Sequence, residues 1–314
     1  MAAMATDLLQ QPVPTSVEAS NMNSVVKVLA ESTDLLFLLK FHLSKVIQEL
    51  GKACEEWGFF VLVNHIIQET LMKATIERAL EFFDLLEEDK RKYEAKRVSD
   101  PIKYGSGSAI TTSDEKIFLW RDFIKSYVHP EFHYPDKPQN LRKSENLGLE
   151  EGYMEEILKL DSMFQLFAAN YYPPCPQPNQ AIGLPPHTDH GLLTFLIHNG
   201  VTGLQIQHNG KWFNINSPQN SILVNTADQF EIFSIGRYKS VNHRAVVNNQ
   251  ATRISVVIPN GPAPEAIVDP ASPLVQRDGH PLYRSFKYME YVETRLSKRV
   301  EGKSNLDYAE IQNN

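Results

Sequence analysis

Three side chains in this sequence have the types and spacing of a metal-binding site. His187 and Asp189 stand two residues apart in the run HTD, at the mouth of a predicted strand. Alternate residues of a strand share a face, so we expect both side chains on the same side. His243 follows several strands later, in VNHRAV, and a closed double sheet can return it to the same place. Two imidazoles and one carboxylate leave coordination positions open, which suits iron(II) that activates dioxygen beside a chelating co-substrate.

A second pair of residues indicates what that co-substrate is. Arg253 and Ser255 lie in the run TRISVVI, ten residues after His243. Arginine offers a planar, permanently charged fork that matches a carboxylate, and the serine hydroxyl points the same way along the strand. The pair can hold the far end of a dicarboxylate whose near end chelates the metal through a keto oxygen and a carboxylate. The metal site and the arginine together therefore predict 2-oxoglutarate or a similar 2-oxoacid.

Other histidines and another metal chemistry are the alternatives to this interpretation. An isolated histidine is more often a surface or satisfied core residue than a ligand. His190 follows Asp189 directly, so we expect it on the opposite face, in a structural or supporting role. A zinc hydrolase on a cupin-like barrel would share the two-histidine, one-carboxylate set. Arg253 and Ser255 argue against it, because hydrolysis needs no clamp for a distal acid group.

Short strands separated by turn residues must position these side chains. The first part of the chain predicts helices from Leu43 to Cys54 and from Glu69 to Leu86, with a buried strand from Trp57 to Val63 between them. An amphipathic helix is expected from Leu282 to Val300. The pattern predicts an α+β, mainly β fold: a double-stranded β-helix (jelly roll) core with flanking N-terminal and C-terminal helices. Its strands are expected at 164–172, 192–197, 204–207, 212–215, 222–224, 230–233, 245–247 and 253–258.

The composition and periodicity of the sequence divide the chain into three parts. Residues 1–30 are small, polar and aperiodic, and predict a flexible N-terminal arm. Residues 31–150 predict an α/β region that packs on the barrel. Residues 151–314 predict the iron(II) and 2-oxoglutarate dioxygenase jelly-roll domain with its C-terminal helix.

The composition of the chain restricts the classes of partner and the location that we expect. The 314 residues carry a formal net charge of -7 and no stripe of basic residues, which disfavours a nucleic-acid partner. Two cysteines cannot form a disulfide framework, and the start of the chain lacks the pattern of a signal peptide. No apolar run is long enough to span a bilayer. We expect a cytoplasmic monomer that binds a small molecule and dioxygen.

Longer motifs show a family resemblance over most of the chain, from about Leu43 to Leu296. They are GFFVLVNH, WRDF, NYYPPCPQP, LPPHTDHGLLTFL, GLQIQHNGKW, NHRAVVN and TRIS. With them the sequence resembles the plant 2-oxoglutarate and iron(II)-dependent dioxygenases, the specialised-metabolite oxidases that act on flavonoids, gibberellins and hyoscyamine.

The resemblance implies a role for each motif residue. It places iron on His187, Asp189 and His243, and the distal carboxylate of 2-oxoglutarate on Arg253 and Ser255. Asn170 and Tyr172 of the NYYP motif assist the co-substrate. The resemblance also implies the reaction: 2-oxoglutarate is decarboxylated to succinate and CO2 while a small plant metabolite is hydroxylated or otherwise oxidised, with ascorbate as a reductant.

The sequence also departs from that family. The family's IPxID strand is replaced by STDLLFLLKFHL, and Ile66 stands where a glycine follows VNH. The run PQNLRKSENLGLEEGY occupies the place of a long helix before the NYYP motif. A missing helix would leave apolar barrel surface uncovered. The second hypothesis is therefore a shortened, non-catalytic relative that acts as a binding or regulatory protein.

The substrate is the least constrained part of the prediction. Some flavonoid-oxidising relatives carry an aromatic residue shortly after the Arg-x-Ser pair, where this chain has Pro259, which disfavours a flavonoid. An apolar or aromatic metabolite is the leading hypothesis. Its pocket candidates, each equally expected in the core, are Tyr104, Phe118, Trp120 and Phe230.

Overall fold

The computed structural model describes residues 46, 48–65, 67–97, 100–107, 109–111, 116–129, 131, 133–135, 163–278, 280–298 and 304–311. The chain divides into two compact units, Met1–Ala53 and Cys54–Asn314. In the first unit, residues 46 and 48–53 are helical. The expected N-terminal arm, both predicted domain boundaries and the run 138–153 lie outside the described residues.

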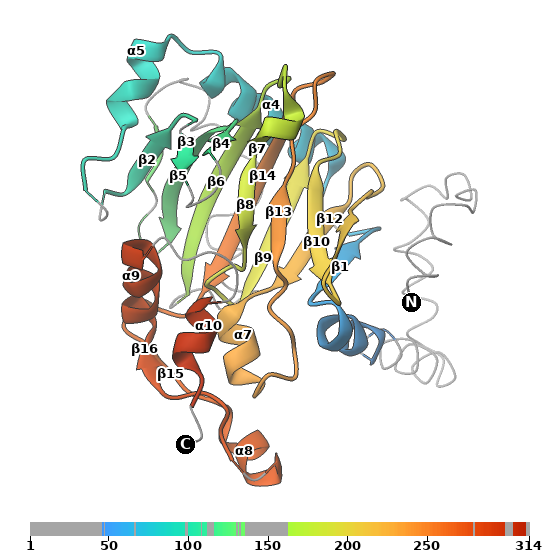
Figure 1. The fold of residues 1–314 in the computed structure, drawn as a ribbon, viewed down its shortest axis with the longest axis vertical. Helices are drawn as coiled ribbons and strands as arrows, with labels where there is room; N and C mark the ends of the chain where they lie inside the picture. The colour runs from blue at the N-terminus through green and yellow to red at the C-terminus, as the bar shows by residue number, and fades with distance from the viewer. Residues whose placement is uncertain are drawn as a thin grey trace, which may run out of the picture. The chain divides into compact units, whose positions relative to one another are not determined.

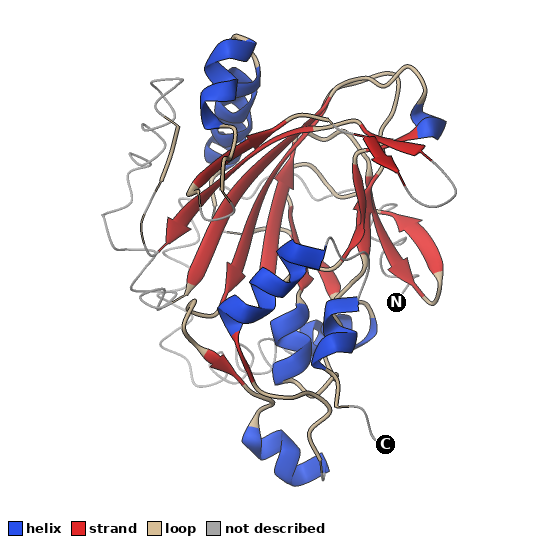
Figure 2. Cartoon of the chain, turned by 60° about the vertical axis from the view of Figure 1, so that its left-hand side comes forward, coloured by secondary structure: helices blue, strands red, loops and turns tan. Residues whose placement is uncertain are grey.

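Two antiparallel sheets form the larger unit (Figure 1). Figure 2 shows these sheets facing each other, which confirms the predicted double-stranded β-helix. The large sheet has the order β1 (Phe59–Leu62), β12 (Ile222–Thr226), β9 (Leu193–His198), β14 (Arg253–Gly261), β6 (Phe164–Tyr172), β5 (Asp122–His129) and β2 (Ile102–Gly105). The small sheet has the order β11 (Lys211–Asn214), β10 (Leu204–His208), β13 (His243–Ala245) and β8 (Leu184–His187).

Smaller elements surround these sheets. Strands β3 (Ala109–Thr111), β4 (Lys116–Leu119) and β7 (Ala181–Ile182) form one further sheet, and β15 (Ile267–Val268) pairs with β16 (Phe286–Lys287). The helices are α4 (Glu69–Phe83), α5 (Glu87–Lys90), α7 (Asp228–Phe233), α8 (Ser272–Asp278), α9 (Tyr288–Lys298) and α10 (Ser304–Ala309), with 3-10 turns η1 (Arg91–Tyr93) and η4 (Pro178–Gln180). In the described part of the chain, no helix has the length and apolar character needed to cross a membrane.

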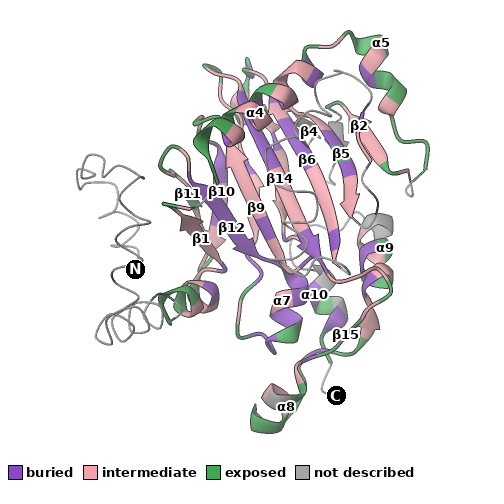
Figure 3. Cartoon of the chain, turned by 180° about the vertical axis from the view of Figure 1, so that it is seen from behind, coloured by how far each residue is buried: buried purple, intermediate pink, exposed green. Residues whose placement is uncertain are grey.

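Helix α4 covers the outer face of the large sheet, where it packs on β14 and β6 (Figure 3). Its buried side chains recur at helical spacing and include Ile76, Ala79 and Phe82. They join Ala169 of β6 and Ile254 of β14 in one apolar cluster. Because strand residues alternate between faces, the neighbours of Ala169 and Ile254 point to the other side, into the space between the sheets.

Helix α9 contributes a second apolar cluster at the other end of the large sheet. Tyr288, Tyr291 and Val292 of this helix pack with Phe164 of β6 and Ile232 of α7. Tyr288 is 1% exposed, so this helix is part of the core. The cluster holds α9 beside the strands that carry the candidate site.

Three predicted elements differ in the structure. Residues 230–233 were expected as a strand, but 228–233 form α7, because buried Asp228, Gln229, Glu231 and Ile232 follow helical spacing and the run FEIF is too short to distinguish the two. The strand expected at 245–247 is β13, His243–Ala245, with an irregularity in its pairing to β8. The helix expected from Leu282 begins at Tyr288, after the short strand β16.

The cluster under α4 gives a stability prediction. Phe82 is 1% exposed, so Phe82→Ala should lower the free energy of unfolding by about 3–5 kcal/mol through lost burial and a residual cavity. Urea denaturation followed by circular dichroism measures the change. Leu86→Ala is the control, since Leu86 is 67% exposed and its replacement should cost less than about 0.5 kcal/mol. Equal losses in the two variants would contradict this account of the core.

Candidate metal and co-substrate site

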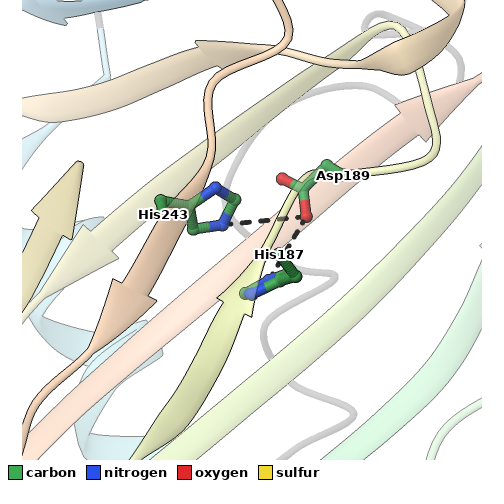
Figure 4. A group of neighbouring side chains, drawn as sticks. All are labelled: His187, Asp189 and His243. Atoms are coloured by element: carbon green, nitrogen blue, oxygen red, sulfur yellow. Dashed lines mark ion pairs between the residues drawn. The ribbon is translucent and has the colours of Figure 1, made fainter. Parts of the chain in front are cut away.

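The small sheet sets two histidines side by side. Strands β8 and β13 are antiparallel neighbours, and His187 pairs directly with His243 in their register. Asp189 follows in the loop after β8, and its Oδ1 lies 3.8 Å from His187 Nε2 and 3.9 Å from His243 Nε2 (Figure 4). One ligand atom from each of the three residues lies within 4.8 Å of the others. This convergence is what joint coordination of one ion requires.

Hydrogen bonds orient both imidazole rings. His187 Nδ1 donates to the Pro185 carbonyl at 2.8 Å, and His243 Nδ1 donates to the Val241 carbonyl at 3.1 Å. A carbonyl only accepts, so the proton of each neutral ring is on Nδ1 and the lone pair is on Nε2. Both lone pairs therefore face Asp189, as in a metal site whose ligands are oriented by their outer hydrogen bonds.

The protonation states at the site also suit a cation. Burial lowers the pKa of His187 well below its usual value, and the neighbouring His243 acts in the same direction. Burial alone would raise the pKa of Asp189, but His243, His187 and a hydrogen bond from Asn225 outweigh it and hold the pKa below its usual range. Asn225 Nδ2 donates to Asp189 Oδ2 at 2.9 Å, which leaves Oδ1 directed at the histidines. A metal ion would then bind without displacing protons from these two groups.

A buried ion pair anchors the loop that carries Asp189. Arg295 of α9 lies 3.1 Å from the carboxylate of Asp228, which is fully buried. The same guanidinium donates to the carbonyl of Thr188, the residue between His187 and Asp189. The backbone N–H of Asp228 donates to the carbonyl of Asp189 at 2.9 Å. Removing one partner of such a buried pair would leave an uncompensated charge, so the pair strongly constrains the loop.

Arg253 stands on the inner face of the large sheet without a carboxylate partner among the described residues. It is 2% exposed, and its Nη1 donates to Ser255 Oγ at 3.4 Å. Its guanidinium carbon lies 5.1 Å from the ring centroid of Tyr172, and its Nε has no hydrogen-bond partner in the described structure. Burial lowers the pKa of Arg253, with Tyr172 opposing the shift, yet an arginine stays charged. A buried, incompletely partnered guanidinium implies an anionic ligand.

A close backbone approach makes room for Arg253. Gly203, just before β10, has a φ of +150°, and a Cβ there would lie 2.9 Å from Arg253 Cδ and 2.8 Å from the Val246 carbonyl. Any other residue at this position would collide with the arginine or with the backbone. The glycine in the run GLQIQ therefore belongs to the same site.

A cavity of about 480 Å³ between the two sheets joins these groups. It is lined by the metal-ligand candidates and by Asn170, Tyr172, Arg253 and Ser255, so all seven predicted metal and co-substrate residues meet there. The antiparallel register of β6 and β14 pairs Arg253 with Tyr172 and Ser255 with Asn170. The volume is in the range of small-molecule sites.

The four residues expected to line a substrate pocket are not brought together. Tyr104 lines the cavity, although its hydroxyl also reaches Glu87 at 3.5 Å. The other three are absent from the cavity's described lining. Phe118 is 46% exposed, Trp120 donates to the Pro173 carbonyl at 3.0 Å, and Phe230 stacks on Tyr238 at 5.2 Å. Aromatic type alone did not distinguish a pocket wall from these surroundings.

The basic side chains that line the cavity were not predicted from the sequence. Among the described residues that line it, Asp189 is the only carboxylate, against six cations: Lys103, Arg121, Lys125, Arg244, Arg253 and Arg295. His190 also lines it, but its Nδ1 bonds with the Tyr288 hydroxyl at 2.8 Å, and burial lowers its pKa to about 4. The run WRDFIK contains Arg121 and Lys125 at the same strand periodicity, which is the signal that could have identified them.

Comparisons with known families match both parts of the chain. The 2OG-Fe(II) oxygenase superfamily matches residues 163–262, and the family described as "non-haem dioxygenase in morphine synthesis N-terminal" matches residues 34–147. The first match contains all seven predicted metal and co-substrate residues.

Individual proteins show the same similarity. The chain is 39% identical to 2-oxoglutarate-dependent dioxygenase 19 of Oryza sativa subsp. japonica, with 85% of each chain covered. It is 35% identical to flavanone 3-dioxygenase 2 of the same species, over 82% of this chain and 81% of that one. A crystal structure of JOX2 in complex with 2OG, Fe and JA matches with a TM-score of 0.69 and 29% identity, covering 85% of this chain and 86% of that chain.

The hydrogen bond to Asp189 gives a prediction about metal affinity. Asn225→Ala should weaken iron(II) binding by roughly 10-fold to 100-fold, because the ligand carboxylate loses the partner that orients it. Anaerobic titration with iron(II), followed by calorimetry, measures the dissociation constant. Asn214→Ala on exposed β11 is the matched control and should bind iron(II) as the unsubstituted protein does. Unchanged affinity in Asn225→Ala would show that Asp189 does not need this bond.

Proposed function

Since the chain belongs to the 2OG-Fe(II) oxygenase superfamily, we propose that His187, Asp189 and His243 hold its iron and that Arg253 and Ser255 hold the distal carboxylate of 2-oxoglutarate. The protein is a 2-oxoglutarate-dependent dioxygenase that oxidises a small molecule. Iron(II) and 2-oxoglutarate together supply dioxygen activation, with release of succinate and CO2. The protein's own residues bind, orient and enclose the reactants.

The buried guanidinium of Arg253 is the observation that carries this proposal. A bidentate carboxylate would satisfy its fork and compensate its charge at once. The Ser255 hydroxyl can donate to the same carboxylate, and the Tyr172 ring shields the pair from water. Asn170, one row nearer the centre of the sheet, accepts a hydrogen bond from Arg121 at 3.1 Å and leaves its amide N–H groups for the co-substrate.

The two alternative functions, a zinc hydrolase and a non-catalytic relative, have no comparable support. A zinc hydrolase would use the three ligands but not Arg253. A non-catalytic relative would not need both imidazoles oriented toward one carboxylate, and no observation favours it. Residues 138–153, which occupy the place of the family's long helix, lie outside the described residues.

The proposal also includes the class of the substrate. Relatives named for flavanone oxidation and a neighbour with bound JA support a small plant metabolite of specialised metabolism as the substrate. A monomeric state, a cytoplasmic location, ascorbate as reductant and the three-part division at residues 30 and 150 stay predictions of the sequence.

Formation of the metal and co-substrate chelate tests the proposal directly. Anaerobic addition of iron(II) and 2-oxoglutarate should produce the weak visible charge-transfer band of the chelate. Asp189→Ala should lose the band and turnover, because two neutral imidazoles cannot replace the ligand charge. Asp122→Ala, on β5 of the large sheet and outside the ligand group, is the control. A full band in Asp189→Ala would refute the assignment of the ligands.

The clamp for the distal carboxylate has its own test. Arg253→Lys should raise the apparent KM for 2-oxoglutarate by roughly 10-fold to 100-fold, because a point charge replaces a bidentate fork. Arg237→Lys, whose exposed side chain pairs with Glu55, is the control and should leave the KM unchanged. Succinate production at varied 2-oxoglutarate concentration measures both. An unchanged KM in Arg253→Lys would mean that the distal carboxylate binds elsewhere.

A further inference from the structure

Lys125 is a cation inside the cavity that the proposed co-substrate site does not use. It lies on β5 between the buried residues Ile124 and Ser126, and it lines the cavity. Its side chain is exposed to solvent and is part of the cavity lining. Within the described residues no carboxylate lies at ion-pair distance from it. The Phe123 ring, 5.4 Å from its Nζ, is the partner that the structure gives it.

The sheet register places a second lysine directly opposite. Lys125 of β5 pairs with Lys103 of β2 on one side and with Ala168 of β6 on the other. Both lysines line the cavity, and Lys103 Nζ lies 5.7 Å from the Tyr127 ring centroid. Like charges opposite each other on neighbouring strands repel and destabilise the pair. Because Asp100 opposes the lowering of the Lys103 pKa by burial, Lys125 is the ammonium group that an anion would chiefly compensate.

The surrounding charges increase the positive potential at Lys125. Burial lowers its pKa to about 8, Arg121 acts next in the same direction, and Lys103 and Arg295 add to it, while Asp189 opposes them. Arg295 is compensated by Asp228, and Arg253 is assigned to 2-oxoglutarate. Among the described residues, neither Lys125 nor Arg121 has a carboxylate at ion-pair distance, although Asp189 acts on Lys125 and Asp122 acts on Arg121 from farther away. A cluster of positive charges of this kind along a cavity wall is stabilised by a bound anion.

The position of Lys125 separates it from the co-substrate clamp. Across the large sheet, Arg253 pairs with Tyr172, whereas Lys125 shares a row with Ala168 and Val257. Four residues of strand separate Arg253 from Val257, a distance of about 13 Å at the usual rise per residue. The distal carboxylate of 2-oxoglutarate, if held by Arg253, therefore lies in a different row of the sheet from Lys125. The second cation therefore matches a second anion.

We propose that the substrate is a small organic acid whose carboxylate binds Lys125, with Lys103 and Arg121 adding positive charge. The proposal rests on the proposed function and names the class of its substrate. The small side chain of Ala168 leaves space beside the lysine, and apolar side chains of Leu166, Leu196 and Val257 line the neighbouring wall. These walls fit an apolar body, so one carboxylate on an aromatic or alicyclic skeleton suits the cavity better than a phosphate ester.

Matched pairs of acid and amide test this proposal. Phenylacetate, cinnamate and naphthoate are titrated anaerobically into the protein loaded with iron(II) and 2-oxoglutarate, and each is compared by calorimetry with its primary amide. At least one acid should bind roughly 10-fold to 100-fold more tightly than its amide, the effect of a hydrogen bond to a charged group. Acids that bind no better than their amides, or phenyl phosphate that binds more tightly than every acid, would overturn the proposal.

Variants at Lys125 test whether this residue causes the preference for the acid over the amide. Lys125→Met should reduce the difference between acid and amide to less than about 2-fold, and Lys125→Arg should retain most of it, because only the second keeps the charge. Lys211→Met on exposed β11 is the matched control and should keep the full preference. A preference that persists in Lys125→Met would place the anion elsewhere and overturn the assignment.

The chelate band separates this inference from the proposed function. Lys125→Met should form the band as the unsubstituted protein does, because Lys125 contacts neither the iron ligands nor the 2-oxoglutarate clamp. A missing band in the unsubstituted protein refutes the proposed function. A normal band with no acid preference refutes only the substrate class.

Discussion

The pairing of β8 with β13 is the constraint on which the site depends. It sets His187 opposite His243, and two backbone carbonyls then orient both rings so that their free nitrogens face Asp189. The loop that carries Asp189 cannot relax away, because the Arg295 and Asp228 pair ties it to α9 and α7. The protein thus builds the ligand geometry through its own hydrogen bonds, and binding of a metal ion requires little rearrangement of these side chains.

Electrostatic imbalance is the second feature of the site. Among the described residues, one carboxylate and six cations line the cavity, a distribution that costs folding free energy unless anions enter. In the proposed function, iron with 2-oxoglutarate would compensate Asp189 and Arg253, and the Asp228 carboxylate compensates Arg295. In the proposed arrangement the co-substrate lies toward β14, and the carboxylate of the substrate, bound at Lys125, lies toward β5 and β2.

The outer face of the large sheet contributes to stability, and its inner face carries the polar residues of the candidate site. On the outer face, Ala169 and Ile254 pack under α4 with Phe82 in a hydrophobic cluster. On the inner face, Asn170, Arg253 and Ser255 are polar and line the cavity. Strand alternation lets neighbouring residues serve both purposes, so the apolar packing under α4 supports a rigid inner surface that can tolerate buried charge.

The sequence by itself determined the fold class and predicted metal and co-substrate residues that the structure brings to one cavity, because HTD, NYYP and TRIS are local patterns whose period-two spacing assigns a face. It misassigned residues 230–233, since a short apolar run fits strand and helix equally. It also favoured Phe118, Trp120 and Phe230 over Lys125 as cavity residues. Only the tertiary structure decided these points. Strand periodicity tells which residues share a face, but the long-range register of β2, β5 and β6 decides which of them meet, and that register is made by hydrogen bonds between distant segments.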